Sequence, residues 1–173
     1  MLNVNLKKFK KLHKEGKNQL LYYSCISKND LQIKNLIDNF LNEQNSSIFE
    51  SVEKGKIRGR YTIFGKNPDK IWEFNENKAY YVNGKYKKII KGRPKKIIEG
   101  IIDNFKFKTP KNLPPICSLI SGFFSYDIIR YIEKIPKTCS NDLSLPDARI
   151  LRPRTIVVHD NYEKKNILYN KLF

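Results

Sequence analysis

Few side chains in this sequence could carry acid–base chemistry, and they do not form a catalytic set. His159 stands beside Asp160, and His13 lies in a basic segment near the start of the chain. A neighbouring histidine and carboxylate can transfer protons, but no nucleophile with a partner base accompanies them. The sequence also contains no glycine-rich phosphate loop, no dinucleotide fingerprint and no histidine or glutamate cluster with metal-ligand spacing. We therefore predict no catalytic and no metal-binding residue in this chain.

The three cysteines are Cys25, Cys117 and Cys139, and their wide spacing fits neither a disulfide framework nor a CxxC metal motif. Cys25 and Cys117 lie in apolar runs, where a free thiol usually behaves as a small buried hydrophobic group. This pattern predicts a reducing compartment. No signal-like segment and no run approaching about 18 apolar residues is present. We therefore expect a soluble, cytoplasmic protein with no membrane partner.

One stretch carries a more specific pattern. A strand ends in Glu50 and Ser51, a glycine-bearing turn follows, and Gly59, Arg60 and Tyr61 open the next strand. A carboxylate and a hydroxyl at a strand end can bind the ammonium group of a free amino acid, while an apolar wall accepts its side chain. Taken by themselves, however, these residues are better explained as a plain strand end.

A second stretch, from residue 113 to residue 158, holds several blocks in a fixed order. It begins with Leu-Pro-Pro and continues as an apolar run that contains Gly122 and ends in Tyr-Asp. An Arg-hydrophobic-Glu-x-x-Pro segment, Asp-Leu, Leu-Pro-Asp-Ala and a final apolar strand follow. Glycine inside an apolar strand indicates a close approach of the backbone to a neighbour.

The elements that must position these residues are short strands and a few helices. Strand-forming runs bounded by turn residues predict strands at 19–26, 47–52, 59–65, 70–74, 78–82, 86–90, 116–126, 155–159 and 166–169. Apolar residues at helical spacing predict helices at 31–41, 94–104 and 127–132. Asp30 can cap the first of these helices, and Pro94 suits the first turn of the second. The sequence predicts an α+β fold of mainly antiparallel, sandwich-like sheets with helices packed on the outside.

The net charge of +17 comes from 27 Lys and 7 Arg against 17 acidic residues. A basic chain of this size can bind nucleic acid or an anionic membrane. Arginine is the usual residue for specific phosphate and base contacts, and here the lysines are spread from Lys7 to Lys171. The chain also holds 22 Ile and 18 Asn but 2 Ala. Lys, Ile and Asn have A/T-rich codons, so a base bias together with a solvated surface explains the charge.

The two stretches resemble the N-terminal domain of anthranilate synthase component I. At the first, that family has Leu-Leu-Glu-Ser-Val-Glu, a short turn and Gly-Arg-Tyr-Ser-Phe-Ile-Gly. At the second, it carries the same series of blocks in the same order. The resemblance covers about residues 18–170, and we assign residues 18–173 to a domain of this type. Residues 1–17 form a basic lead-in, whose apolar residues at roughly helical spacing predict a short helix: Val4, Leu6, Phe9 and Leu12.

The resemblance implies a lyase of tryptophan biosynthesis that makes anthranilate from chorismate and ammonia. In that family the enzyme uses Mg²⁺, works with a glutamine amidotransferase (component II) and is inhibited by tryptophan. Its chorismate- and metal-binding residues lie in a C-terminal domain that this chain does not contain, so we expect the chain to be inactive by itself and to hold no cofactor. The family's Glu-Ser motif contributes to the tryptophan pocket and maps onto Glu50 and Ser51. Arg60 and Tyr61 belong to the same region.

Some positions depart from the family pattern. Residues 29–33 replace a Thr-Pro-Val-Ser segment, and Ser118, Leu119 and Ser125 replace glycines, which would crowd a close backbone approach. Two alternatives stay open. The chain could act as a stand-alone amino-acid-sensing module, or, as a weaker alternative, as a basic nucleic-acid-binding domain.

Overall fold

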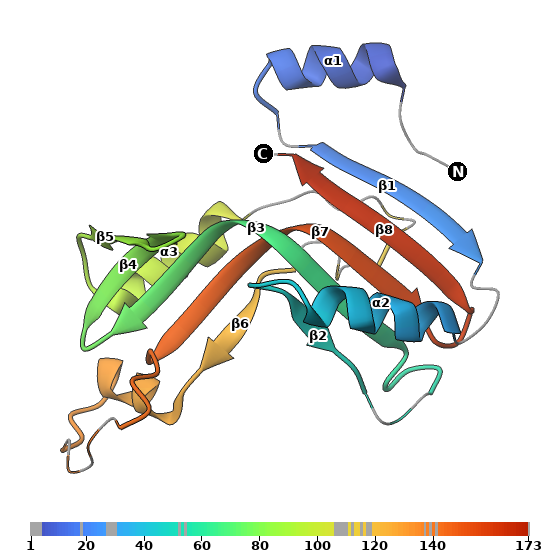
Figure 1. Cartoon of the computed structure of the whole chain (residues 1–173). Helices are drawn as coiled ribbons and strands as arrows, with labels where there is room; N and C mark the ends of the chain where they lie inside the picture. Colours follow the sequence, from blue (N-terminus) through green and yellow to red (C-terminus); the bar gives the residue numbers. More distant parts are fainter. Residues whose placement is uncertain are drawn as a thin grey trace. The chain divides into compact units, whose positions relative to one another are not determined.

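The computed structural model combines three short α-helices with one antiparallel sheet (Figure 1). It describes residues 5–17, 19–26, 31–51, 53, 55–105, 111, 113–114, 116, 119–136, 138, 140 and 142–172. The helices are α1 (Leu6–Lys14), α2 (Leu31–Leu41) and α3 (Pro94–Asn104), together with the 3₁₀ helix η2 (Tyr126–Tyr131). The strands are β1 (Gln19–Ile26), β2 (Ser47–Phe49), β3 (Tyr61–Asn75), β4 (Lys78–Asn83), β5 (Tyr86–Ile90), β6 (Ser121–Phe124), β7 (Ala148–Asp160) and β8 (Lys165–Leu172).

The sheet runs in the order β1-β8-β7-β3-β4-β5, with β2 paired to β3 and β6 paired to β7. Neighbouring strands pair antiparallel, as in β1–β8, β3–β4 and β7–β8. The predicted α+β class with antiparallel strands is therefore confirmed. The described α-helices are 9 to 11 residues long, and no described helix is long and apolar enough to cross a membrane.

The chain folds into two compact units. Unit 1 comprises residues 1–68, 109–119 and 153–173, and unit 2 comprises residues 69–108 and 120–152. The long strands β3 and β7 run through both units. The part of β3 up to Pro68 and the part of β7 from Pro153 onward belong to unit 1, and the rest of each strand belongs to unit 2. The assignment of residues 18–173 to one domain of the family type stays a prediction.

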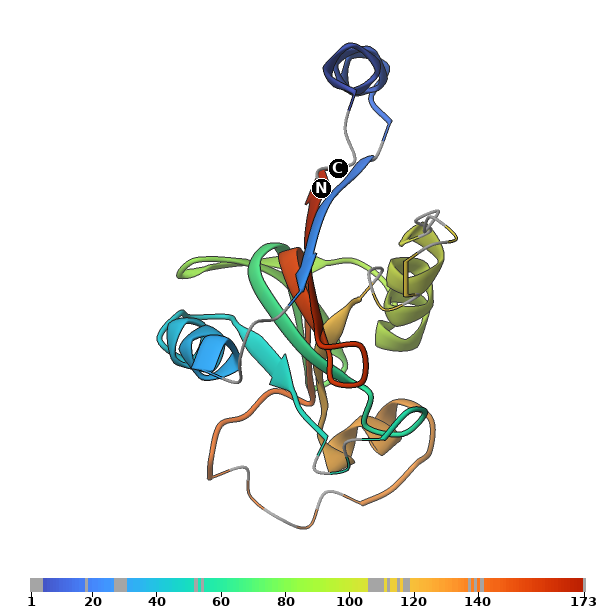
Figure 2. The same cartoon turned by 90° about the vertical axis from the view of Figure 1, so that its right-hand side faces the viewer.

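Unit 1 buries apolar side chains on both faces of its strands. Because successive residues of a strand point to opposite faces, Ile156 and Val158 belong to one cluster and Val157 to another. α2 covers the Val157 face with Leu36 and Phe40, and Figure 2 shows this helix on one side of the strands. The opposite cluster combines strand residues with the segment before β6: Leu113, Ile156, Val158, Ile167 and Tyr169.

Unit 2 packs α3 against strands β3, β4 and β7. Its fully buried residues include Phe74, Ala79 and Ala148. Three isoleucines of α3 pack against them: Ile97, Ile98 and Ile101. Pro94 occupies the first turn of α3, as the sequence predicts. The close approach expected at Gly122 is confirmed, since a β-carbon there would lie 2.0 Å from the carbonyl oxygen of Arg149.

Several elements differ from the sequence-based expectations. The two strands predicted at 59–65 and 70–74 are one continuous strand, β3, that passes through Asn67 in the left-handed region (φ +51°). The strand predicted at 116–126 is shorter and ends at Phe124, where η2 follows. Cys25 is exposed, contrary to expectation, because it lies near the end of the edge strand β1. Asp30, Cys117, Ser118 and Cys139 lie outside the described residues.

Candidate functional site

The turn between β2 and β3 brings the Glu-Ser and Gly-Arg-Tyr segments together. The backbone N–H of Gly55 donates to the carbonyl of Arg58 at 3.0 Å, which closes the turn. Gly59 then takes a left-handed conformation (φ +65°) and lies directly against the segment that carries Ser51. A β-carbon at Gly59 would lie 1.4 Å from the carbonyl oxygen of Glu53 and 2.8 Å from the Ser51 Oγ. Glycine is therefore required at position 59.

Arg60 is held by two carboxylates. Its Nε and one terminal nitrogen donate to Asp160 Oδ2 at 2.9 and 2.6 Å, and the same terminal nitrogen donates to Glu163 Oε1 at 3.0 Å. Its guanidinium also lies 5.1 Å from the centre of the Tyr61 ring and 5.8 Å from that of Tyr162. These contacts join the start of β3 to the turn between β7 and β8.

Charge and hydrogen bonding at this junction shift two pKa values. Burial opposes the ionisation of Asp160, whose side chain is 5% exposed, but hydrogen bonds from Arg60 and from the backbone N–H groups of Glu163 and Tyr162 outweigh it. The pKa of Asp160 is therefore lowered. The hydrogen bond to Asp160 raises the pKa of Arg60 above its ordinary value. Both groups are charged near neutral pH, and the ion pair is permanent there.

Three of the four residues assigned to the effector site thus lie in one region of unit 1. Ser51 is half-buried beside Gly59, Arg60 follows directly, and Tyr61 is half-buried against the core that contains Ile156. Glu50 directly follows β2, and its side chain is exposed. The role of these four residues in an effector site stays a prediction, and sequence reasoning missed Asp160 as the partner of Arg60.

The neighbouring residues His159 and Asp160 do not act as a pair. His159 is completely buried and its Nδ1 bonds to Asn166 Oδ1 at 2.7 Å, whereas Asp160 binds Arg60. Since consecutive strand residues point to opposite faces, the two side chains diverge. His159 Nε2 has no hydrogen-bond partner in the described part of the chain. The prediction that the chain has no catalytic residue stays a prediction.

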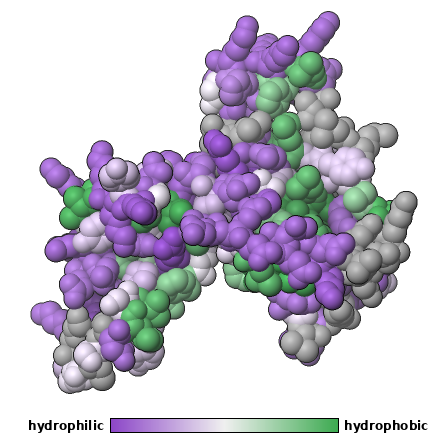
Figure 3. Space-filling view, in the orientation of Figure 1, coloured by the Kyte–Doolittle hydropathy of each residue, from purple (hydrophilic) through white to green (hydrophobic). Residues whose placement is uncertain are grey.

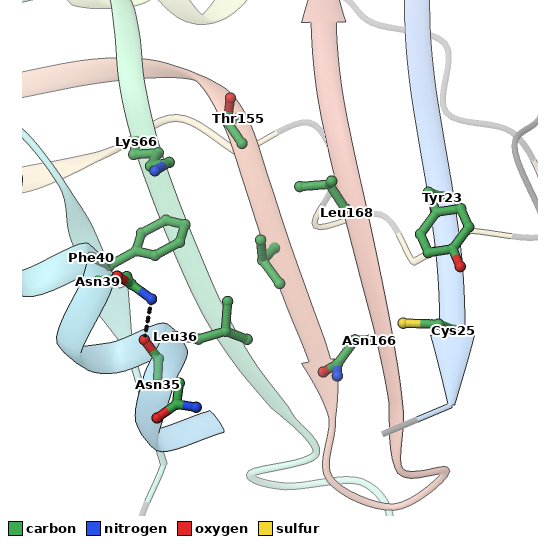
Figure 4. Close-up of a pocket in the computed structure, with 11 residues that line it drawn as sticks. Tyr23, Cys25, Asn35, Leu36, Asn39, Phe40, Lys66, Thr155, Asn166 and Leu168 are labelled. Atoms are coloured by element: carbon green, nitrogen blue, oxygen red, sulfur yellow. Dashed lines mark hydrogen bonds between the residues drawn. The ribbon is translucent and has the colours of Figure 1, made fainter. Parts of the chain in front are cut away.

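An open pocket of about 550 Å³ lies in unit 1 between α2 and strands β3, β7, β8 and β1 (Figure 4). Its apolar walls come from Leu36, Phe40, Val157 and Leu168. Lys66 also lines the pocket. Its ammonium group donates a hydrogen bond to Glu43 Oε1 at 2.6 Å and lies 5.0 Å from the centre of the Phe40 ring. The remaining lining residues are mostly uncharged and polar: Tyr23, Cys25, Asn35, Asn39, Thr155 and Asn166. No sequence pattern pointed to this pocket, since it combines residues from five separate elements.

The described residues offer no metal centre. No three or more His, Cys, Asp or Glu side chains converge among them in a way that could hold a metal ion. Asp160 and Glu163 instead accept hydrogen bonds from Arg60, and Asp160 also accepts them from backbone N–H groups. Residues that would fit Mg²⁺ are therefore not found in the described part of this chain.

The chain is similar to several anthranilate synthases. It is 29% identical over 163 residues to anthranilate synthase component 1 of Cereibacter sphaeroides, covering 91% of this chain and 32% of that protein. It is 35% identical over 127 residues to the component 1 of Acetivibrio thermocellus, covering 71% of this chain and 26% of that protein. A chloroplastic anthranilate synthase alpha subunit 1 of rice, Oryza sativa subsp. indica, is 32% identical over 173 residues. This match covers 91% of this chain and 30% of that protein.

The chain therefore spans about a third or less of the length of the curated relatives it matches. It matches no family model. The similarity extends over nearly the whole chain, in agreement with the resemblance of the two sequence stretches.

Proposed function

Because this chain belongs to the anthranilate synthase component I family, we propose that it forms the N-terminal, tryptophan-responsive part of such an enzyme. Its own residues bind the effector and shape one side of the pocket. The conversion of chorismate requires a chorismate-binding domain, which holds the Mg²⁺, and a glutamine amidotransferase (component II) supplies the ammonia. The chain alone is inactive on chorismate, and it works in the cytoplasm.

The observation that carries this proposal is the contact between Ser51 and Gly59. Gly59 lies just before β3 and directly against the segment that carries Ser51, since a β-carbon on Gly59 would lie 2.8 Å from the Ser51 Oγ. A hydroxyl on a fixed segment loses little conformational freedom when it binds a ligand. Ser51 accordingly accepts a hydrogen bond from the ammonium group of the amino acid. The exposed carboxylate of Glu50 supplies the opposite charge, which strengthens such a bond.

Arg60 and Tyr61 contribute to the site in a different manner. The guanidinium of Arg60 is shared between Asp160 and Glu163, and this supports a positioning role for it. Tyr61 lies half-buried beneath the guanidinium and can form part of an apolar wall. We assign ligand contact primarily to Ser51 and Glu50.

Exposed apolar side chains in unit 1 support a large partner surface. Tyr23 and Leu168 line the open pocket and leave 46% and 42% of their surface exposed, and Ile26 at the end of β1 leaves 77% exposed. Apolar groups gathered around an open pocket often mark a protein interface. This supports a complex with the chorismate-binding domain.

Calorimetric titration of tryptophan into the chain combined with a chorismate-binding domain tests the effector site. We expect Ser51→Ala to weaken binding at least about tenfold, which corresponds to the loss of one charge-assisted hydrogen bond. Glu50→Gln should weaken it by a similar factor, and its exposed position makes a folding defect unexpected. The matched control is Ser140→Ala, because Ser140 is exposed in unit 2.

Equal affinity of the Ser51→Ala and Ser140→Ala complexes would contradict the assignment of Ser51. Micromolar tryptophan binding by the chain alone would instead support a stand-alone amino-acid-sensing module. In both cases the family membership is unaffected, so the experiment isolates the role of the site.

A further inference from the structure

A pocket of about 290 Å³ lies in unit 2 between α3 and the sheet. Its walls combine aromatic and aliphatic side chains: Trp72, Ile97, Ile101 and Phe105. Two basic residues, Lys70 and Arg152, also line it, and no carboxylate of the described residues does. Pockets for small molecules are mostly apolar, with a few polar groups, and begin at about 300 Å³. This pocket therefore has the size and the lining for a ligand of one or two rings.

The pairing of the strands places the aromatic wall on the face of the sheet that α3 covers. Trp72 of β3 is opposite Tyr81 of β4, and Tyr81 is opposite Lys88 of β5. Opposite residues of antiparallel strands share a face, so these three side chains form a row. Ala79, two positions from Tyr81, is on the same face and belongs to the cluster against which α3 packs. The row leads from the pocket to Lys88, which is exposed.

The charged groups of the pocket favour an anion. Arg152 is already paired, since its Nε donates to Asp69 Oδ1 at 2.7 Å and a terminal nitrogen pairs with Asp69 Oδ2. Lys70, in contrast, is exposed and forms no ion pair with any described residue. A negative group in the pocket would therefore be attracted by Lys70 without competition from a carboxylate of the described chain.

The segment 78–96, which contains β4, β5 and the start of α3, adds positive charge to unit 2. It carries no acidic residue and eight basic ones, all of them exposed: Lys78, Lys85, Lys87, Lys88, Lys91, Arg93, Lys95 and Lys96. Figure 3 accordingly shows mainly hydrophilic groups over β4 and β5. Asp and Glu also have A/T-rich codons, so a base bias does not explain their absence from this segment. Positive charge of one sign over such a region attracts anionic ligands.

Gly100 keeps the pocket open on the side of α3. It lies in the interior of this helix, where glycine is among the least favourable residues. A β-carbon at this position would meet no atom within 4 Å, so no close contact with a described residue requires glycine there. Gly100 lines the pocket, and a larger side chain would fill part of it. The glycine thus leaves space beside Trp72 that a ligand can occupy.

We propose that this pocket binds a small aromatic monocarboxylate. Its ring would lie against Trp72 and over Gly100, and its carboxylate would pair with Lys70. An uncharged aromatic compound would lose this charge-assisted hydrogen bond, and an aliphatic acid would lose the contact with the indole ring. The inference goes beyond the proposed function, because the pocket belongs to unit 2, whereas Ser51 and Glu50 belong to unit 1.

Fluorescence of Trp72 provides the test, because this residue is the single tryptophan of the chain and lines the pocket. The full chain is titrated with 4-methylbenzoate and, separately, with its uncharged analogue 4-methylbenzamide. We expect the acid to change the fluorescence saturably, with a Kd of about 1 mM or lower, as is typical of a ligand this small. The amide should bind at least about fivefold more weakly, since it lacks the charge that pairs with Lys70.

Two variants assign the parts of the site. Lys70→Met should weaken binding of the acid at least about fivefold and leave binding of the amide unchanged. Its matched control is Lys78→Met, because Lys78 is exposed on the opposite face of the sheet from Trp72. This control should bind the acid within about twofold of wild type. Gly100→Leu should abolish binding of both compounds without lowering the melting temperature, since leucine fills the pocket and favours the helix.

Equal affinity of the wild-type chain for the acid and the amide would overturn the pairing of a carboxylate with Lys70. Undiminished binding by Gly100→Leu would overturn the pocket as the binding site, and no saturable change with either compound would overturn the whole inference. None of these outcomes affects the role proposed for Ser51. Conversely, Ser51→Ala should leave binding of 4-methylbenzoate unchanged, so failure of the proposed function and failure of this inference are distinguishable.

Discussion

Ser51 Oγ lies 2.8 Å from the point that a β-carbon on Gly59 would occupy, so these two residues fit together only while position 59 carries no side chain. The same glycine faces the carbonyl of Glu53 at an even shorter distance. Ser51 of the Glu-Ser motif and Gly59 of the Gly-Arg-Tyr motif, eight positions apart in the sequence, therefore lie next to each other. The geometry explains why the Glu-Ser segment that follows β2 is accompanied by a glycine just before β3.

Replacing Gly59 by Ala should destabilise unit 1 by more than the cost of the backbone conformation. A left-handed conformation costs an L-residue about 1–2 kcal/mol, and the clash with the Glu53 carbonyl adds to this. Gly84→Ala is the control, because Gly84 has a similar φ of +58° and nothing within 4 Å of the added carbon. In urea unfolding, Gly59→Ala should lower the free energy of unfolding by at least about 1 kcal/mol more than the control does. Equal losses would mean that the Ser51–Gly59 contact is not tight.

Asp160→Asn should lower the free energy of unfolding by about 1–3 kcal/mol at pH 7, because it removes the buried negative charge that pairs with Arg60. The pKa of Asp160 is lowered in the folded state, so its ionisation stabilises the fold above the ordinary aspartate pKa of about 3.9. This contribution is lost as the pH falls through the folded-state value.

Urea unfolding from pH 3 to pH 7 checks this prediction. The difference in the free energy of unfolding between wild type and Asp160→Asn should stay constant above about pH 5 and become smaller below about pH 4. A difference that does not change with pH would show that the ionised form of Asp160 is not favoured by the fold.

The helices and the outer strand could be predicted closely from the sequence, whereas the long-range contacts could not. α2, α3 and β1 occur where the apolar spacing and Pro94 place them, because these signals are local. The sequence predicts two strands where the structure has the single strand β3, since Asn67 and the proline after it suggest a break. Pairing with neighbouring strands keeps β3 continuous through them. Arg60 and Asp160 are 100 positions apart, and no local pattern reveals that they meet.

Tyr131→Phe should make the free energy of unfolding of unit 2 less dependent on pH in the alkaline range. The Tyr131 hydroxyl is partly buried and donates to Asp147 Oδ2 at 2.6 Å, so burial first, and then the hydrogen bond to this carboxylate, raise the pKa of Tyr131. A raised pKa stabilises the fold below the ordinary tyrosine value of about 10, and this contribution disappears as the pH rises above it.

At pH 7 the free energy of unfolding of the variant should be about 1–2 kcal/mol lower than that of wild type. This difference in free energy should shrink above about pH 10. Absorbance at 295 nm during alkaline titration provides the readout, since wild type should contain one late-titrating tyrosine more than the variant. Identical titration curves would contradict the coupling between Tyr131 and Asp147.

Two glycines of unit 2 should respond to alanine with opposite signs. Gly122→Ala places a carbon 2.0 Å from the Arg149 carbonyl oxygen and should separate β6 from β7, with a loss of at least about 2 kcal/mol. Gly100→Ala adds a carbon within α3 that meets nothing within 4 Å, and it should raise stability by about 0.5–1 kcal/mol. Urea unfolding of both variants checks the signs, and a neutral Gly122→Ala would refute the close approach.

The most direct test of the central claim is formation of anthranilate from chorismate, ammonia and Mg²⁺, followed by its fluorescence. The chain alone and a separately produced chorismate-binding domain should each show little or no turnover, while their mixture should be active and inhibited by tryptophan. Ser51→Ala in the mixture should keep the activity and lose the inhibition. Turnover by the chain alone, or a mixture whose activity does not depend on the chain, would contradict the account.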